Sequence, residues 1–374
     1  MMKRKNIYAY YFPNWHVDAL NEKWHGRGWT EWEVVKCARA RFEGHAQPKV
    51  PLWGYEDEAD PRIMEKKIRT AREYGIDGFI FDTYCFAESD YRMRCLDEGF
   101  LKADTKFPFA VMWCNHDAIY AHPSPRNLIS PVLMSGAVTE ADFVRITDSF
   151  IRKYFTCPNY IRVDGKLLFI IYNVGKLVKE FGSVRETARI FGEFRERVRR
   201  AGLGEVHLAC VPDIIEDLLD QPRKLNALLA ELGIDEGVRY WWPVKYDDDR
   251  LCVEYSDFVD AGIGTFRHDA EFYEIPMTVH LMTGLDQSPR TIQSETYENL
   301  NVYPWYAVVV NSCPKEYERA LRAAKVFTQS KEYRGSFVTV IWNEWTEGNY
   351  LEPDEEFGYG YLEAIRNVFG VNEK

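Results

Sequence analysis

The sequence predicts an α/β protein in which eight parallel strands, each followed by helical structure, close into a single (β/α)8 TIM barrel. Apolar, strand-like segments alternate with amphipathic helical segments along the whole chain, and there are eight strand-like segments. Helical crossovers return the chain in the same direction, so the strands are parallel. Eight is the number of strands that closes this barrel. A doubly wound open sheet is the alternative, but no glycine-rich phosphate loop follows the first strand.

The expected strands are short apolar runs enriched in β-branched and aromatic residues. They are 7–12, 77–83, 108–114, 167–172, 206–211, 238–242, 276–282 and 337–342. Three of the intervening helices have clear signals. Asp60-Pro61 is a cap followed by proline at the first helical position, and that helix should stop at Gly75. Segment 184–201 has apolar residues at helical spacing, and segment 314–330 again opens with proline.

Residues 1–374 are expected to form one catalytic domain, because no linker or low-complexity run divides the chain, although length alone favours two domains. Two connections are much longer than an ordinary βα loop: residues 13–60 after the first strand and residues 283–313 after the seventh. The several tryptophans within 13–60 indicate that this loop is ordered. In a barrel both loops lie on the catalytic face, together with the end of the eighth strand.

Composition excludes several classes of function. Hydrophobic residues make up 46% of the chain, which is ample for a large core, and the net charge is −11. An acidic surface disfavours nucleic acid and anionic lipid as partners. No apolar run approaches the roughly 18 residues of a membrane span. We therefore expect no nucleic acid partner and no membrane insertion.

The cysteines and the N-terminus indicate a cytoplasmic protein. The eight cysteines form no CxxC pair, and Cys85, Cys114 and Cys210 lie in or beside strand-like runs, where a reduced buried thiol is expected. The first residues are basic, but the apolar run that follows is short and lacks a cleavage site, so it is interpreted as the first strand. The histidines show no metal-binding constellation, so neither a metal nor another cofactor is expected.

The segment Trp342-Asn343-Glu344-Trp345-Thr346-Glu347-Gly348 directly follows the eighth expected strand and is the strongest functional signal. Two carboxyl groups close together can protonate a glycosidic oxygen and act on the opposite side of the sugar. Indole rings supply a stacking surface for a pyranose and an apolar wall that raises a carboxyl pKa. The motif therefore predicts sugar chemistry with an oligosaccharide or polysaccharide as the partner.

Other candidate substrate-binding residues lie at the expected strand ends or in the long first loop. An ion pair between Asp286 and Arg290, which would fix the seventh loop, is expected in preference to sugar contact by either residue. The substrate-binding candidates are Tyr11, Trp29, Glu31, Trp32, His45, Asp82, Trp113, Asn115, His116, Tyr172, Trp242, Trp342 and Trp345.

Several segments together resemble one family. They are Tyr10–Pro13 with His16, Gly28–Trp32, Gly44-His45, Gln47-Pro48, Tyr74–Phe79, Val163–Lys166, Gly284–Asp286 with Pro289-Arg290, and Trp342–Gly348 with Leu351–Pro353. Over about residues 7–365 the chain resembles the WbsX-like proteins, which are relatives of the family 99 glycoside hydrolases. Those hydrolases are endo-acting α-mannosidases.

This resemblance implies a (β/α)8 barrel that cleaves an α-mannoside-like bond with retention of configuration. In the family 99 enzymes retention is attributed to the sugar's own 2-hydroxyl, which attacks the anomeric carbon and forms a 1,2-anhydro sugar. Carried over by position, Glu344 is the base that takes the hydroxyl proton. Glu347 is the acid that protonates the leaving oxygen and then the base that activates water.

The chain departs from the family pattern at two strand ends. After the third strand the WbsX-like pattern is Trp-Ala-Asn-Glu, whereas here it is Trp113-Cys114-Asn115-His116. An imidazole replaces a carboxylate, so the sugar specificity of that subsite does not carry over. The second strand ends with Asp82 among aromatic residues, where the family is purely aromatic.

Two other functions remain as alternatives. Some WbsX-like proteins are described as glycosyltransferases, and a transferase of polysaccharide biosynthesis would need a nucleotide-sugar site. Asp247-Asp248-Asp249 is the nearest candidate for the metal motif of such a site, although a solvated helix start is the preferred interpretation. The third hypothesis is a glycan-binding barrel without catalytic activity, which the presence of both glutamates disfavours.

Overall fold

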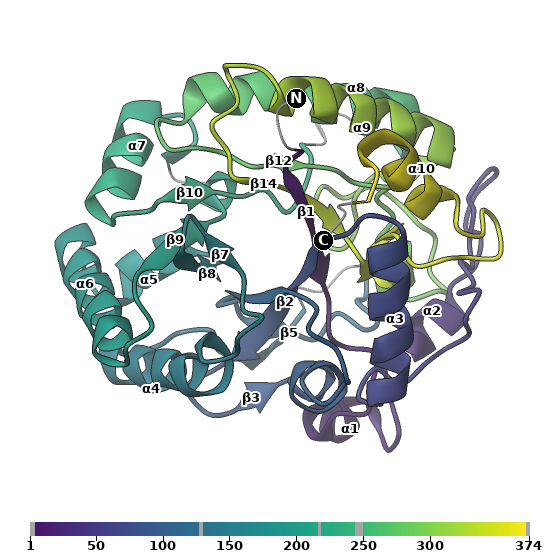
Figure 1. Cartoon of the computed structure of the whole chain (residues 1–374). Coiled ribbons are helices and arrows are strands. Elements are labelled where there is room, and N and C mark those ends of the chain that lie inside the picture. Colours follow the sequence, from purple (N-terminus) through teal and green to yellow (C-terminus); the bar gives the residue numbers. More distant parts are fainter. Residues whose placement is uncertain (1–3, 127–129, 216–217, 244–249, 372–374) are drawn as a thin grey trace.

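The strands form a ring that is surrounded by helices, as the view along the ring axis shows (Figure 1). The structure, a computed structural model, describes residues 4–126, 130–215, 218–243 and 250–371. The predicted α/β barrel is confirmed. The strands of the ring are β1 (Asn6–Tyr11), β2 (Gly78–Cys85), β4 (Phe109–Trp113), β8 (Lys166–Ile171), β9 (Val206–Cys210), β10 (Glu236–Gly237), β12 (Val279–His280) and β14 (Phe337–Ile341).

The ring strands are parallel and follow the order β10-β9-β8-β4-β2-β1-β14-β12. A parallel bridge between Gly237 and Met277 joins the two ends of this order. At that junction the Gly237 amide donates to the Pro276 carbonyl at 2.8 Å, and the Thr278 amide donates to the Gly237 carbonyl at 2.9 Å. A Cβ at Gly237 would lie 2.1 Å from the Met277 sulfur, so this thioether packs into the space that the glycine leaves.

Six of the eight predicted strands agree with the structure to within two residues, whereas the sixth and seventh differ more. The regular strand β10 ends at Gly237, so residues 238–242 lie beyond it. In the predicted segment 276–282 only Val279 and His280 belong to a strand. Both corrections have one cause: these two segments meet at the closing bridge, where regular pairing is brief. Residues beyond Gly237 are then free to turn toward the site.

Helices surround the ring, and the three predicted from sequence are confirmed. The Asp60 carboxylate caps the first of them by accepting from the Arg62 amide at 2.9 Å. The outer helices are α3 (Pro61–Glu73), α4 (Glu140–Phe150), α5 (Val174–Glu180), α6 (Val184–Arg200), α7 (Pro222–Glu231), α8 (Tyr255–Phe272), α9 (Pro314–Thr328) and α10 (Gly360–Phe369).

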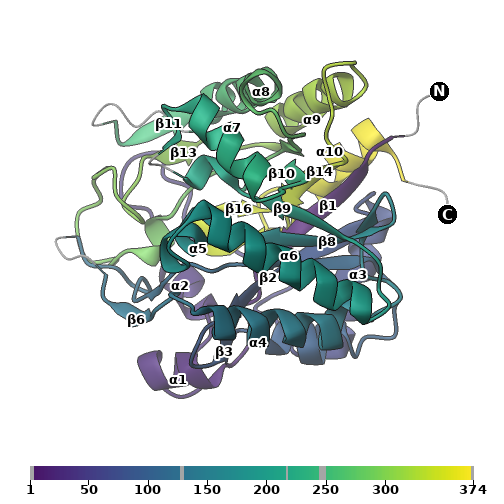
Figure 2. The ribbon, with the colours of Figure 1, turned by 90° about the vertical axis from the view of Figure 1, so that its left-hand side faces the viewer.

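The long connections gather at one end of the barrel, opposite the chain termini (Figure 2). The first long loop contains α1 (Ala19–His25) and α2 (Trp32–Cys37), and it is therefore ordered as its tryptophans predicted. The short strands outside the ring are β3 (Asp90–Tyr91), β5 (Ala118–Ile119), β6 (Val132–Met134), β7 (Arg162–Val163), β11 (Cys252–Glu254), β13 (Val308–Val310), β15 (Asn343–Glu344) and β16 (Asn349–Tyr350).

The core is apolar and rich in aromatic side chains. Cys85, Cys114 and Cys210 are buried and free, as predicted. Among the described helices none is both long enough and apolar enough to cross a bilayer.

Candidate active site

The glutamate motif leaves the barrel at the end of β14 through a tight turn. Strand β15 pairs with β16, and a single turn of 3-10 helix, Trp345–Glu347, lies between them. Gly348 then adopts a left-handed conformation with φ of 66°, and a Cβ there would lie 2.9 Å from the Asp286 amide nitrogen. Glycine is thus required both by conformation and by space. This turn directs Glu344 and Glu347 to the same side of the barrel mouth.

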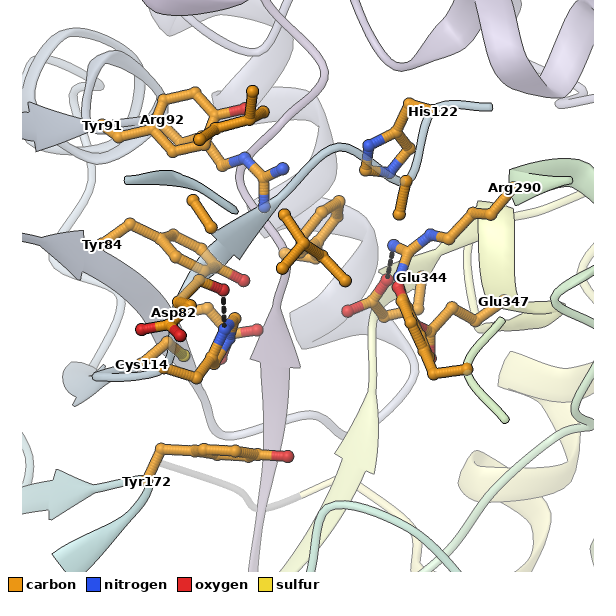
Figure 3. A pocket seen from close by; sticks show the side chains of 18 of the residues that line it. Asp82, Tyr84, Tyr91, Arg92, Cys114, His122, Tyr172, Arg290, Glu344 and Glu347 are labelled. Atoms are coloured by element: carbon orange, nitrogen blue, oxygen red, sulfur yellow. Dashed lines mark hydrogen bonds and ion pairs between the residues drawn. The ribbon is translucent and has the colours of Figure 1, made fainter. Parts of the chain in front are cut away.

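A cavity of about 330 Å³ opens beside the two glutamates. This volume falls within the range of small-ligand sites, which is roughly 300 to 1,000 Å³. Asp82 at β2, His116 after β4 and Tyr172 after β8 also line it, so the ends of several strands contribute to one site. Figure 3 shows Asp82 and Tyr172 beside the cavity, with the two glutamates on one wall. Such convergence at the mouth of a barrel is typical of an active site.

Arg290 holds three carboxylates together at one wall of the cavity. Its Nη2 lies 3.1 Å from Glu344 and 3.1 Å from Glu31, and its Nη1 contacts Glu347. The predicted pair between Asp286 and Arg290 is therefore wrong. Asp286 instead accepts from Gln47 at 2.7 Å and lies 2.9 Å from the His45 imidazole. Both residues fix the seventh loop, Asp286 through His45 and Gln47 and Arg290 through the three glutamates.

Tyr240 contacts two carboxyl groups with one hydroxyl. Its oxygen lies 2.8 Å from Asp82 and 2.9 Å from Glu344. A phenol has a single proton to donate, so both contacts are hydrogen bonds only if one of the two carboxyl groups is protonated. Burial raises the pKa of Asp82 to about 8. The raised pKa of Asp82, together with the raised pKa of Glu344, keeps a proton within this group of Asp82, Tyr240 and Glu344 at neutral pH.

Burial is the main cause of the raised pKa values of Glu344 and Glu347. It raises the pKa of Glu344 well above the usual range, and the neighbouring Glu347 charge raises it further while Arg290 opposes the rise. Burial also raises the pKa of Glu347, which Arg290 again opposes. The pair thus retains a proton at a pH where exposed glutamates have lost theirs. In the empty site Glu344 holds the proton more readily, because Glu347 has the tighter contact with the cation.

Three predicted aromatic contacts with the sugar are wrong because the side chains point away from the cavity. The Tyr11 hydroxyl donates to the buried Glu58 at 2.7 Å, the Trp113 indole donates to the Cys85 carbonyl at 3.0 Å, and Trp342 packs against Phe79. Successive strand residues face opposite sides of a sheet. These three residues occupy the side turned toward the helices.

Three other predicted substrate-binding residues are buried by local packing. Trp32 packs on Trp15 with ring centroids 4.1 Å apart, and Trp345 stacks on Tyr350 at 3.8 Å. The side chain of Asn115 makes two hydrogen bonds to the backbone of Asn173. None of the predicted residues Trp32, Trp345 and Asn115 lines the cavity.

Trp242 is a further correction, because its indole packs on α8 and donates to the His280 carbonyl at 2.8 Å. The ring fits there because Gly262 has no side chain: a Cβ would lie 2.2 Å from the indole. Its neighbour Trp241 lines the cavity instead. Both tryptophans lie beyond the last regular residue of β10, where strict alternation no longer applies.

Glu31, His45 and Trp29 lie near the site without lining it. Glu31 is fully buried and accepts from Thr346 and Asn14, each at 2.5 Å, in addition to its contact with Arg290. These contacts make it a positioning group for Arg290. His45 faces a separate hollow with Asp286, and Trp29 stacks on His25 at 4.2 Å, behind the cavity wall.

Arg92, Tyr240, Trp241 and Arg290 line the cavity, although none was a predicted substrate-binding or catalytic residue. Tyr240 and Trp241 lie in the predicted strand segment 238–242, so their position at a strand end was an available signal. Arg92 follows the short strand β3 in the loop after β2, and only the folded structure brings it to the site. In the described part of the chain no group of three or more His, Cys, Asp or Glu side chains could hold a metal ion.

The fold is a barrel similar to those of solved glycoside hydrolase-like proteins. The chain is similar to the solved GH99 endo-alpha-mannosidase from Bacteroides thetaiotaomicron, with 14% identity, a TM-score of 0.59, and coverage of 99% of this chain and 97% of that one. It is also similar to a solved glycoside hydrolase-like protein, with 16% identity, a TM-score of 0.60, and coverage of 99% and 95%. At such identities the likeness establishes the fold.

The chain belongs to the family described as glycosyltransferase WbsX, whose model matches residues 7–365, so the predicted family is confirmed. Its curated relatives include the uncharacterized protein WxcX from two strains of Xanthomonas campestris pv. campestris. Each is 25% identical over 97% of this chain and 49% of the relative. The chain thus spans about half the length of these relatives.

Proposed function

We propose that this protein is a retaining glycoside hydrolase that cleaves an α-mannoside-like bond, with Glu344 and Glu347 as its catalytic pair. The observation that supports this most strongly is the convergence of both carboxylates on one arginine beside a cavity at the barrel mouth. Enzymes that hydrolyse glycosides use two carboxyl groups that flank the scissile bond. The similarity of the fold to a solved GH99 endo-alpha-mannosidase supports an α-mannoside-like substrate.

In the proposed reaction Glu344 takes the proton of the sugar's 2-hydroxyl, and the hydroxyl oxygen attacks the anomeric carbon. The bond to the leaving oxygen breaks as Glu347 transfers its proton to that oxygen, and a 1,2-anhydro sugar forms. Water then attacks the anomeric carbon and gives a proton to Glu347. The opening oxygen recovers its proton from Glu344, so two inversions restore the original configuration.

Sugar binding assigns the proton within the pair. The 2-hydroxyl donates a hydrogen bond to Glu344, which favours the ionised form, and the glycosidic oxygen accepts one from Glu347, which favours the protonated form. Tyr240 and Arg290 already donate to Glu344 and stabilise its charge. The site therefore needs only to transfer one proton from Glu344 to Glu347 when the substrate enters.

The test compares Glu344→Gln and Glu347→Gln with the wild type on an α-mannoside panel that includes aryl leaving groups of different pKa. Both variants should lose turnover by at least about a hundredfold, since general acid–base catalysis contributes roughly 10² to 10⁴ in rate. Only the Glu347 variant should recover on leaving groups of low pKa, because these need no protonation. Glu332→Gln, which removes an exposed carboxylate that does not line the cavity, is the control.

Other results would contradict the proposal. Near-normal hydrolysis by either variant would remove that carboxylate from the mechanism. Tight calorimetric binding of a nucleotide sugar without hydrolysis of any α-mannoside would favour the transferase that the family description names. Asp247–Asp249, the sequence candidate for that function, lies outside the described residues. Glycan affinity without turnover would favour a binding protein.

A further inference from the structure

Arg92 lies in an aromatic collar on the cavity wall. Its guanidinium carbon lies 4.4 Å from the ring centroid of Tyr91, 4.8 Å from that of Tyr84 and 5.0 Å from that of Phe12. The side chain lines the cavity, and the residue is 9% exposed. In Figure 3 the guanidinium points into the cavity from the wall opposite Arg290 and the glutamates.

The charge of Arg92 has no ion-pair partner among the residues that the structure describes. Its Nε is buried without a hydrogen-bond partner. The nearby Asp18 carboxylate accepts from the Arg92 backbone amide at 3.2 Å, not from its guanidinium. Glu31 attracts Arg92 at longer range, but that carboxylate is already bound to Arg290. Its side chain contacts the Tyr91 hydroxyl and the aromatic rings, and buried charges are normally paired with an opposite charge, so this cation at the cavity wall is suited to an anionic partner from outside.

The backbone at Arg92 adds an independent observation. Its φ is 62°, a left-handed conformation that costs a residue other than glycine free energy. Strain of this kind is retained where the surrounding structure imposes it, commonly at ligand sites. Here the conformation belongs to the residue whose side chain reaches the cavity from the short loop after β3.

We propose that Arg92 binds a negatively charged substituent of the glycan, so that the substrate is an acidic sugar polymer. The inference rests on the proposed function, because it names the substrate class of the same site. The guanidinium carbons of Arg92 and Arg290 lie 5.0 and 5.5 Å from the same Phe12 ring centroid. The charged substituent therefore belongs to the sugar whose bond is cleaved or to its immediate neighbour.

The site suits a single negative charge, such as a uronate carboxylate or a sulfate ester. One guanidinium in a collar of aromatic rings offers one positive charge and a planar fork of donors that matches a carboxylate. Arg290 supplies no further free charge, since three carboxylates surround it. The guanidinium of Arg92 already packs against the collar, so little side-chain freedom remains to be lost on binding.

Calorimetry with four methyl α-mannosides tests the inference without any need for catalysis. The probes are the neutral mannoside, its 6-carboxylate, the 6-carboxamide, which has the shape of the carboxylate without its charge, and the 6-sulfate. Wild-type protein should bind the carboxylate or the sulfate about tenfold to a hundredfold more tightly than the carboxamide, as expected for hydrogen bonds to a charged group. Which of the two anions binds more tightly identifies the substituent.

Variants then assign the preference to Arg92. Arg92→Gln should reduce the ratio of anion to carboxamide affinity to about one, whereas Arg92→Lys should retain most of it. Arg267→Gln, which removes an exposed arginine, should leave the ratio unchanged. Equal affinity of the wild type for anion and carboxamide, or no binding of either anion, would overturn the inference even if Arg92→Gln failed to fold.

The two proposals fail separately. Hydrolysis of neutral α-mannosides without any preference for the anionic probes would leave the hydrolase standing and refute the role of Arg92. Selective anion binding without hydrolysis of any glycoside would support the role of Arg92 and refute the hydrolase.

Discussion

Replacing Arg290 with glutamine should destabilise the fold in a way that depends on pH. Arg290 contacts Glu31, Glu344 and Glu347, and all four side chains are almost completely buried. Each close pair represents about 4 kcal/mol of attraction at an effective dielectric of about 20, which the desolvation of the charges partly offsets. Removing one member of a buried pair costs about 3 to 5 kcal/mol, and we expect a loss of that size at pH 8.

The loss should be smaller at pH 5. Arg290 lowers the pKa of each of its carboxyl partners, so its removal raises those pKa values in the folded state. A carboxyl whose folded pKa exceeds the unfolded value of about 4.3 contributes stability at low pH, and this is lost as pH rises through the folded pKa. Urea unfolding of wild type and Arg290→Gln at both pH values measures the difference.

A second substitution controls for charge. Adding Glu31→Gln to Arg290→Gln removes one of the unpaired carboxylates, so the double variant should be more stable than the single variant at pH 8. Destabilisation below about 1 kcal/mol, the range of an exposed ion pair, or a loss equal at pH 5 and pH 8, would refute the account of Arg290.

Three other predictions concern the cavity. On the acid side kcat/KM should fall at a pH above the ordinary glutamate pKa, because the pair is inactivated when Glu347 takes a second proton and burial raises the pKa of Glu347; a fall centred near pH 4 would contradict this. Tyr240→Phe should lower kcat/KM about tenfold to a hundredfold through loss of the donor to Glu344, and an unchanged value would exclude the hydrogen bond from catalysis. Trp241→Ala should raise KM, whereas Trp242→Ala should lower the free energy of unfolding by about 3 to 5 kcal/mol and leave KM unchanged; the opposite pattern would reverse the placement of these rings.

The barrel could be predicted because its periodic pattern extends over the whole chain. Strands such as β2 and β14 are buried along their length, so continuous apolar runs mark them clearly. The strands β10 and β12 could not be predicted to the same accuracy. They meet at the closing bridge, and the pairing of Gly237 with Met277 depends on the position of both ends of the sheet.

The candidate site was predicted where chemistry and strand ends coincide, as for Asp82, His116 and Tyr172. The prediction failed where the direction of a side chain decides whether the residue lines the cavity. Tyr11 and Trp113 are one position away from residues that line the cavity, Phe12 and Cys114, and composition gives no information about that choice. Arg290 was expected to bind within its own loop, yet its partners come from distant parts of the chain.

The stereochemistry of the first-formed product tests the central claim most directly. Proton NMR during hydrolysis of an α-mannoside with a free 2-hydroxyl should show the α-anomer first, followed by slow mutarotation. The corresponding 2-deoxy-2-fluoro α-mannoside should not be turned over through this route, since it has no nucleophilic hydroxyl. A β-anomer as the first product would contradict the assignment of Glu344 and Glu347 to a retaining mechanism.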